Sequence, residues 1–163
     1  MTATVNMTAA VNLTHEGNPI EFAETHYVFV ERQGHIPTIA RQTWQGVHAF
    51  FPEIVKQNRI VGGAALYKCD PGAGTYRAGF MLAAPPKNLP QGLNYAHLPA
   101  AKYSRFTLTG PLEQLGEATR RAFEIVAEEK IALRDDFNIE HYVTDPMTTP
   151  ADENVTKILF PTA

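Results

Sequence analysis

The chain has 163 residues, of which 44% are hydrophobic and 19% charged, and its formal net charge is −3. This composition is typical of one globular domain, and the weak acidic excess argues against nucleic acid as the main partner. The single cysteine, Cys69, excludes an internal disulfide and favours a reducing, cytoplasmic compartment. No signal-peptide pattern or apolar run of membrane-spanning length occurs, so no membrane partner is expected.

The first half of the chain predicts strands around one helix. Residues 1–18 are either a disordered leader or an extra edge strand, and Gly17-Asn18-Pro19 is expected to end it. A strand then centres on residues 26–32. Apolar residues at helical spacing predict a single helix up to about Asn58. Two further strands, residues 60–68 and 75–82, flank an Asp-Pro turn.

The second half repeats this order after a proline-rich connector, residues 84–100, which is expected to cross over on the surface. A strand over residues 102–109 leads into a helix that starts at Gly110-Pro111 and runs to about Lys130. A strand then precedes an Asp-Pro turn, and the last strand covers residues 155–160.

Three landmarks recur at an offset of 75 or 76 residues and indicate an internal duplication. The pairs are Gly34 with Gly110, Tyr67 with Tyr142, and Asp70-Pro71 with Asp145-Pro146. They predict one domain, residues 19–163, with halves of about 19–84 and 100–163. The predicted fold class is α+β: two βαββ units form an antiparallel sheet, with both helices on one face and a ligand groove on the other.

Strand alternation and the duplication together predict the residues that line this groove. The expected set is Tyr27, Phe29, Ala65, Tyr67, Tyr103, Arg105, Glu140 and Tyr142, with Trp44 at the rim. Tyrosines suit a site that is partly apolar and partly wet. Glu140 has two interpretations, an ordinary solvated residue or a groove charge that needs a partner. Arg105 is one possible partner, and its charge also leaves open an anionic or neutral ligand.

Several motifs in order resemble the GyrI-like small-molecule-binding family, the effector-binding domain of AraC- and MerR-type multidrug regulators. They are Glu31-Arg32-Gln33-Gly34, residues 60–67, Asp70-Pro71, Tyr76-Arg77, residues 98–103, Thr109-Gly110-Pro111, residues 139–146 and residues 156–161. The resemblance covers about residues 20–161. It implies an SHS2-like fold and a groove that binds bulky aromatic, often cationic compounds, with a carboxylate at Glu140. No helix-turn-helix motif flanks these motifs, so we expect a stand-alone member without direct nucleic acid binding.

Other chemistry finds little support in the sequence. The six histidines lack metal-ligand spacing, and Gly72-Ala73-Gly74 follows a turn and opens no helix, so we expect neither a metal nor a cofactor. Ser104 is expected to face the helices, which disfavours a serine nucleophile. His141 is expected to face them too, as a core histidine.

Three functions therefore stand in order. The first is a small-molecule-binding protein. The second is an enzyme, since some relatives resemble hydrolases that open cyclopropane rings of toxic natural products. The resemblance implies that Glu140 would then be the general base, with Tyr142 stabilising developing charge. The third is a protein inhibitor of DNA gyrase, for which no feature of the sequence marks a binding surface.

Overall fold

The computed structural model describes residues 11–70 and 73–163. Within them, eight mostly antiparallel strands and three α-helices form the predicted α+β fold. The strands are β1 (Leu13–Phe22), β2 (Thr25–Gly34), β3 (Ile60–Asp70), β4 (Ala73–Leu82), β5 (Asn94–Leu98), β6 (Ala101–Thr109), β7 (Asn138–Tyr142) and β8 (Val155–Pro161). The helices are α2 (Ile36–His48), α3 (Phe51–Gln57) and α4 (Leu115–Glu128).

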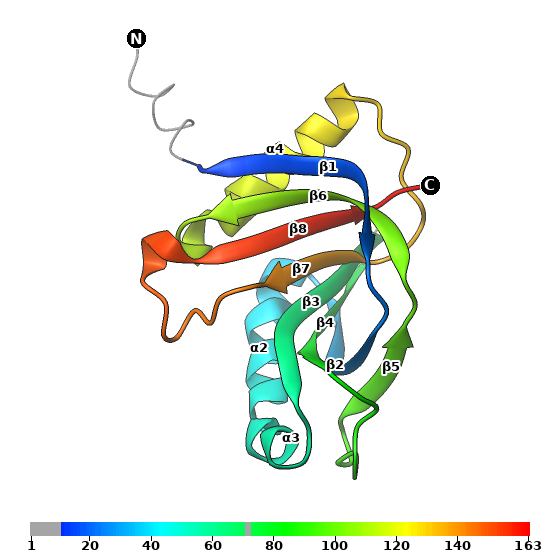
Figure 1. Ribbon diagram of the computed structural model, residues 1–163, viewed down its shortest axis with the longest axis vertical. Coiled ribbons are helices and arrows are strands. Elements are labelled where there is room, and N and C mark those ends of the chain that lie inside the picture. Colours follow the sequence, from blue (N-terminus) through cyan, green and yellow to red (C-terminus); the bar gives the residue numbers. More distant parts are fainter. Residues whose placement is uncertain (1–10, 71–72) are drawn as a thin grey trace. The chain divides into compact units, whose positions relative to one another are not determined.

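The chain divides into two compact units, each built on one βαββ repeat (Figure 1). Unit 1 comprises Met1–Ile20, Lys102–Asp135 and Glu140–Ala163, and unit 2 comprises Glu21–Ala101 and Asp136–Ile139. Strand order is β7-β8-β6-β1 in unit 1 and β3-β4-β2-β5 in unit 2. Each repeat therefore gains a fourth, outermost strand from elsewhere in the chain. Strand β7 begins in unit 2 and ends in unit 1.

In unit 2, α2 packs on one side of β2, β3 and β4. The indole Nε1–H of Trp44 on α2 donates a hydrogen bond to the hydroxyl of Tyr76 (2.9 Å), and its ring meets the edge of Phe80. Tyr76 and Phe80 alternate along β4 with Arg77 and Gly79, which must therefore point to the opposite side. This assignment fixes the orientation of every residue paired with β4.

The predicted single helix is wrong, because the structure contains two. Helix α2 ends at His48, and α3 begins at Phe51 with Pro52 in its first turn. Proline has no N–H, and its ring clashes with the carbonyl four residues earlier, which here belongs to His48. Apolar periodicity continues past this break, so it could not locate the end of α2.

Two strands were also misjudged in the sequence. Strand β5 lies inside the proline-rich connector and pairs antiparallel with β2, Tyr95 opposite Val28. Strand β1 runs through Gly17-Asn18-Pro19, which was expected to end it. A proline is tolerated in an outermost strand because its missing N–H can face away from the ladder. The part of the leader before residue 11 lies outside the described residues.

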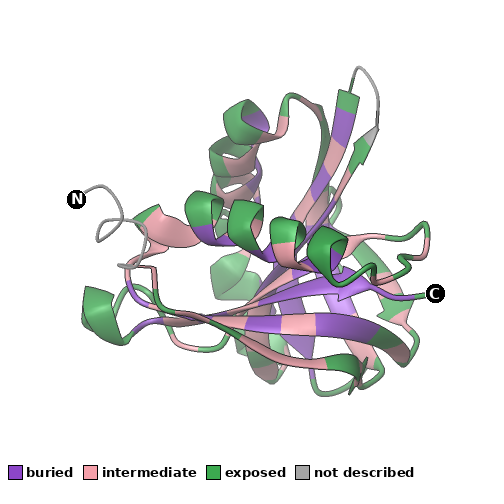
Figure 2. Cartoon of the chain, turned by 90° about the horizontal axis from the view of Figure 1, so that it is seen from above, coloured by how far each residue is buried: buried purple, intermediate pink, exposed green. Residues whose placement is uncertain are grey.

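The core of unit 1 lies between α4 and strands β6 and β8. Small residues on α4 let the helix approach the strands closely, and large side chains fill the strand side. The fully or nearly fully buried members are Phe106, Leu108, Ala118, Ala122, Val126, Ile158 and Phe160. Leu115 and Ile125, predicted to point inward with Ala118 and Ala122, are partly buried against this cluster. Figure 2 shows the contrast between buried strand residues and the exposed outer turns of the helices.

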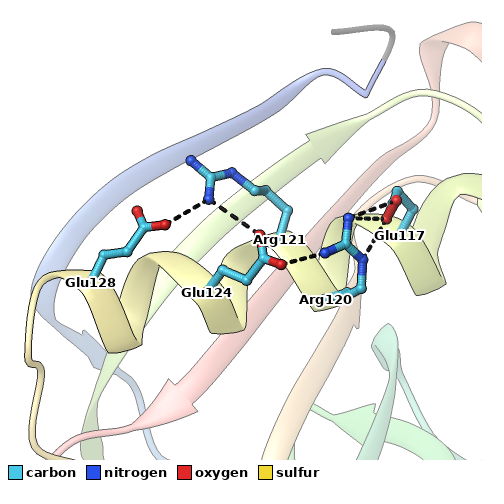
Figure 3. A network of polar contacts seen from close by, with 5 residues as sticks. All are labelled: Glu117, Arg120, Arg121, Glu124 and Glu128. Carbon is cyan, nitrogen blue, oxygen red and sulfur yellow. Dashed lines mark hydrogen bonds and ion pairs between the residues drawn. The ribbon is translucent and has the colours of Figure 1, made fainter. Parts of the chain in front are cut away.

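The outer face of α4 carries a ladder of ion pairs (Figure 3). Arg120 bonds Glu117 and Glu124, while Arg121 bonds Glu124 and Glu128. All five side chains are largely exposed, so each pair contributes only a few tenths of a kcal/mol, roughly 0.2–0.5, and less in high salt. The ladder supports the helix locally, whereas burial of the opposite face determines its position.

The two duplicated glycines adopt the same unusual backbone conformation. Gly34 has φ +147° and Gly110 has φ +145°, each just before the helical segment of its repeat. We expect Gly110→Ala to lower the free energy of unfolding by about 1–3 kcal/mol, since side chains other than hydrogen are strained in this region. Gly116→Ala on α4 is the control: nothing lies within 4 Å of the added Cβ. Helix propensity should then raise stability by up to about 1 kcal/mol. Equal urea midpoints for Gly110→Ala and the wild type would refute the strain.

Candidate functional site

Glu140 and Tyr142 form a carboxylate–phenol pair on β7. The hydroxyl of Tyr142 donates a hydrogen bond to Oε1 of Glu140 (2.7 Å), as expected for residues that alternate onto one side of a strand. Both side chains are half-buried. Burial raises the pKa of Glu140 above its ordinary value, and the bond from Tyr142 only partly offsets this. Among the described residues, no cation pairs with this carboxylate.

The backbone indicates which side of unit 1 these residues occupy. The N–H of Val143 donates to the carbonyl of Val155 (3.0 Å), and in antiparallel strands such a bond joins opposite residues. Counting two residues along each strand places His141 opposite Lys157. Burial lowers the pKa of His141, and Lys157 and Arg105 lower it further, which fits this placement.

Glu140 therefore points to the α4 side of unit 1. Lys157 alternates with Ile158, which packs in the α4 core, so Lys157 and the opposite His141 point away from α4. Glu140 and Tyr142 alternate with His141 and take the other side. The predictions that His141 faces the helix and that Glu140 faces away from it are both wrong. The ligand-binding role of Glu140 stays a prediction.

Arg105 has a different carboxylate partner from the one considered in the sequence. Its Nη2 and Nε donate to Oε2 of Glu16 on β1 (2.8 and 3.1 Å), and Lys157 donates to Oε1 of the same side chain (2.5 Å). Arg105 lies opposite Leu159 on the side away from α4, as does Tyr103 opposite Pro161. Arg105 therefore neutralises Glu16 and leaves Glu140 without a cation. The guanidinium of Arg134 lies over the Tyr103 ring, 5.2 Å from its centroid.

Glu16 should contribute to stability in a pH-dependent way. Burial by itself would raise its pKa, but the hydrogen bonds and charges of Lys157 and Arg105 outweigh burial and lower it. A depressed pKa stabilises the fold above the ordinary Glu range, and that stabilisation is lost as pH falls through the lowered pKa. We expect Glu16→Gln to cost about 1–3 kcal/mol at pH 7 and progressively less in acid. Glu21→Gln, exposed on the same strand, should change little; a similar loss in both variants would contradict the expectation.

In unit 2 the predicted aromatic residues fall on two sides. Tyr67 pairs with Tyr76, and Ala65 pairs with Ala78, so both lie on the α2 side where Trp44 packs. Tyr27 and Phe29 pair with Met81 and Gly79 on the opposite side. The prediction that all four line one face is therefore wrong. Whether any of them contacts a ligand stays a prediction.

Tyr27 belongs to the core of unit 2 and presents no surface to solvent. Its side chain is 0% exposed, and its hydroxyl donates to the carbonyl of Ala64 (2.7 Å). Burial raises the pKa of Tyr27 well above its ordinary value. Its ring stacks on Phe29 with centroids 5.2 Å apart, and the guanidinium of Arg77 covers Phe29 at 4.6 Å. Ligand contact by Tyr27 would require these strands to open.

Ser104, His15 and Glu129 form an arrangement that resembles a catalytic triad. The Nε2 of His15 lies 2.9 Å from Ser104 Oγ, and its Nδ1 lies 3.7 Å from the Glu129 carboxylate. However, Ser104 is 0% exposed and the His15 ring stacks on buried Phe106 (4.2 Å). A nucleophile must reach its substrate, so these residues anchor β1 instead. Sequence analysis missed His15 and Glu16, because an 89-residue separation from their partners leaves no local signal.

The described residues contain no group of three or more His, Cys, Asp or Glu side chains arranged to hold a metal ion. Their helices are also all too short or too polar to cross a membrane.

Comparison with known proteins agrees with this geometry. Residues 15–163 match the model of the GyrI-like small molecule binding domain. The chain belongs to this family. The resemblance inferred from the sequence motifs is thus confirmed over most of the chain. A search of curated proteins finds no significant match.

Solved structures of low sequence identity share the fold of this family member. The EcmrR C-terminal domain is 15% identical with a TM-score of 0.70, and the match covers 94% of this chain and 98% of that one. SAV2435 bound to tetraphenylphosphonium is 13% identical with a TM-score of 0.67, covering 94% and 93%. A hydrolase from Listeria innocua is 10% identical with a TM-score of 0.57, covering 98% of both chains.

Proposed function

We propose that this GyrI-like protein binds bulky aromatic cations and that the carboxylate of Glu140 is their counter-ion. The observation that carries the proposal is a half-buried carboxylate with a raised pKa and no cation partner among the described residues. Removing an unpaired carboxylate from water is costly, and a bound cation would repay that cost. The bond from Tyr142 holds the carboxylate in place and leaves its second oxygen available.

The size and aromatic character of the ligand follow from the family and from its neighbours. SAV2435, which shares the fold, was solved with tetraphenylphosphonium, a cation that carries four phenyl rings. Tyr142 supplies an aromatic ring beside the charge of Glu140, an arrangement suited to delocalised cations. The same arrangement should reject anions of identical shape.

The proposal is tested by titrating the protein with tetraphenylphosphonium and with tetraphenylborate, which has the same shape and the opposite charge. We expect calorimetric binding of the cation, and a rise in melting temperature with its concentration, because a ligand of the native state stabilises it by mass action. Tetraphenylborate should bind at least tenfold more weakly. Equal binding of both ions would assign the interaction to apolar area alone and overturn the role of Glu140.

Hydrolysis is the second candidate, favoured by the same pair of residues. A carboxylate whose pKa is raised toward neutrality is a better general base, and the Tyr142 hydroxyl lies where it could donate to an oxygen that gains charge. The reaction would add water to a strained cyclopropane ring. Incubating the protein with a panel of cyclopropane-bearing natural products, and following the mass increase of one water, tests it. Binding without water addition across the panel would exclude this activity for the compounds tested.

A further inference from the structure

A stack of side chains in unit 2 holds the segment that leads into β7. The guanidinium of Arg77 lies between two rings, 4.6 Å from the Phe29 centroid and 4.4 Å from the Phe137 centroid. Its Nε donates to Glu31 Oε1 (2.7 Å), which fixes the plane of the guanidinium. The ammonium of Lys68 approaches the same Phe137 ring at 5.6 Å. Two cations and a second ring therefore fix the position of Phe137.

This stack bears directly on Glu140 because β7 is short. The strand has five residues, from Asn138 to Tyr142, so its own ladder of hydrogen bonds specifies register weakly. A slip of one residue would move each side chain to the opposite side of the strand. Glu140 would then exchange places with His141 and point away from α4.

We propose that Arg77, through its contact with Phe137, is a positioning residue that locks the register of β7 and so orients Glu140 toward its ligand. Arg77 does not need to touch the ligand. Phe137 is three residues from Glu140 and thus lies on the opposite side of the extended chain. Holding its ring against Arg77 permits only the register in which Glu140 and Tyr142 face the α4 side. This inference rests on the proposed function for its ligand readout and on backbone order for an independent one.

The test uses Arg77→Met, which keeps the apolar stem and removes the cation, beside Arg120→Met as the control. Arg120 also makes two ion pairs but lies on the exposed face of α4. Affinity for tetraphenylphosphonium and amide hydrogen exchange over residues 138–142 are measured for both variants and the wild type. We expect Arg77→Met to weaken binding at least fivefold and to speed exchange at least tenfold, while Arg120→Met changes neither. Arg77→Lys should recover part of both losses, because a cation returns over the ring.

The outcomes separate this inference from the proposed function. If the wild type does not bind the cation, the proposed ligand class is wrong, and the exchange rates alone decide whether the register lock exists. Unchanged exchange in Arg77→Met overturns the lock whatever the ligand does. Faster exchange with unchanged affinity overturns it as well, since the contact would then order the strand without orienting Glu140.

Discussion

Glu140→Gln should abolish most of the affinity for aromatic cations while leaving the fold intact. Glutamine keeps the shape of glutamate and still accepts the hydrogen bond from Tyr142, so only the charge is lost. Interactions with a charged partner are worth about 1.5–3 kcal/mol, which corresponds to a loss of roughly 10- to 150-fold in affinity. Calorimetric titration with tetraphenylphosphonium measures the change. Glu153→Gln, an exposed glutamate of the same unit, is the control and should bind like the wild type; equal affinities of all three proteins would remove Glu140 from the site.

The same substitution should make the protein more stable at neutral pH. A carboxylate whose pKa is higher in the folded than in the unfolded state favours folding while protonated. That contribution is lost as pH rises from the ordinary Glu pKa through the raised one, so ionised Glu140 destabilises the fold. Urea denaturation at pH 7 should therefore show a higher midpoint for Glu140→Gln than for the wild type. The difference should shrink when both are unfolded at pH 4. A lower midpoint at pH 7 would mean that the charge is well paired in the native state.

Gly79→Ala should be among the most destabilising single substitutions in unit 2. A Cβ at this position would lie 2.1 Å from the carbonyl oxygen of Val28 and 2.8 Å from the Cβ of Phe29. Val28 and Phe29 belong to the neighbouring strand β2, whose backbone would have to move away from β4. Overpacking of this kind costs about 1–3 kcal/mol where side chains can adjust, and the backbone contact places this case at about 3 kcal/mol or more. Thermal and urea denaturation measure the loss.

Gly63→Ala provides the matched control on β3. Its added Cβ would meet the nearest atoms, in Gly79 and Phe80, at 3.9 Å, an ordinary van der Waals distance. This variant should stay within about 1 kcal/mol of the wild type, because strands tolerate alanine better than glycine. Similar destabilisation in both variants would show that the steric contact with β2 is not the cause.

Local sequence signals predicted the elements of the fold but not all of their limits. Gly34 and Gly110 identified the duplication because both occupy the same backbone conformation before a helix. The break between α2 and α3 was missed because the apolar stripe continues across Pro52. Strand β5 was missed because its partner β2 lies far away in the sequence, and a polar, proline-flanked segment gives no strong alternation.

The candidate site was predicted in part, and the error has a specific cause. Aligning the repeats correctly grouped Tyr67 with Tyr142, and each lies on the helix side of its own unit. Alternation gives the two sides of a strand but not which side matches that of its neighbour. That relation depends on pairing, and β3 carries an irregularity between Ile60 and Gly62 that shifts its register against β4. Tyr27 was therefore assigned to the wrong companions.

The recruited outermost strands have a consequence for how copies of this chain meet. Pairing of exposed strand edges is the usual first step of fibril growth and domain exchange. Strand β5 offers only five residues for such pairing, with Pro99 directly after it. Strand β1 carries Pro19, which has no N–H to donate to an incoming chain. Each βαββ repeat is therefore bordered by a strand that is a poor template, and the protein should resist aggregation through strand addition at high concentration.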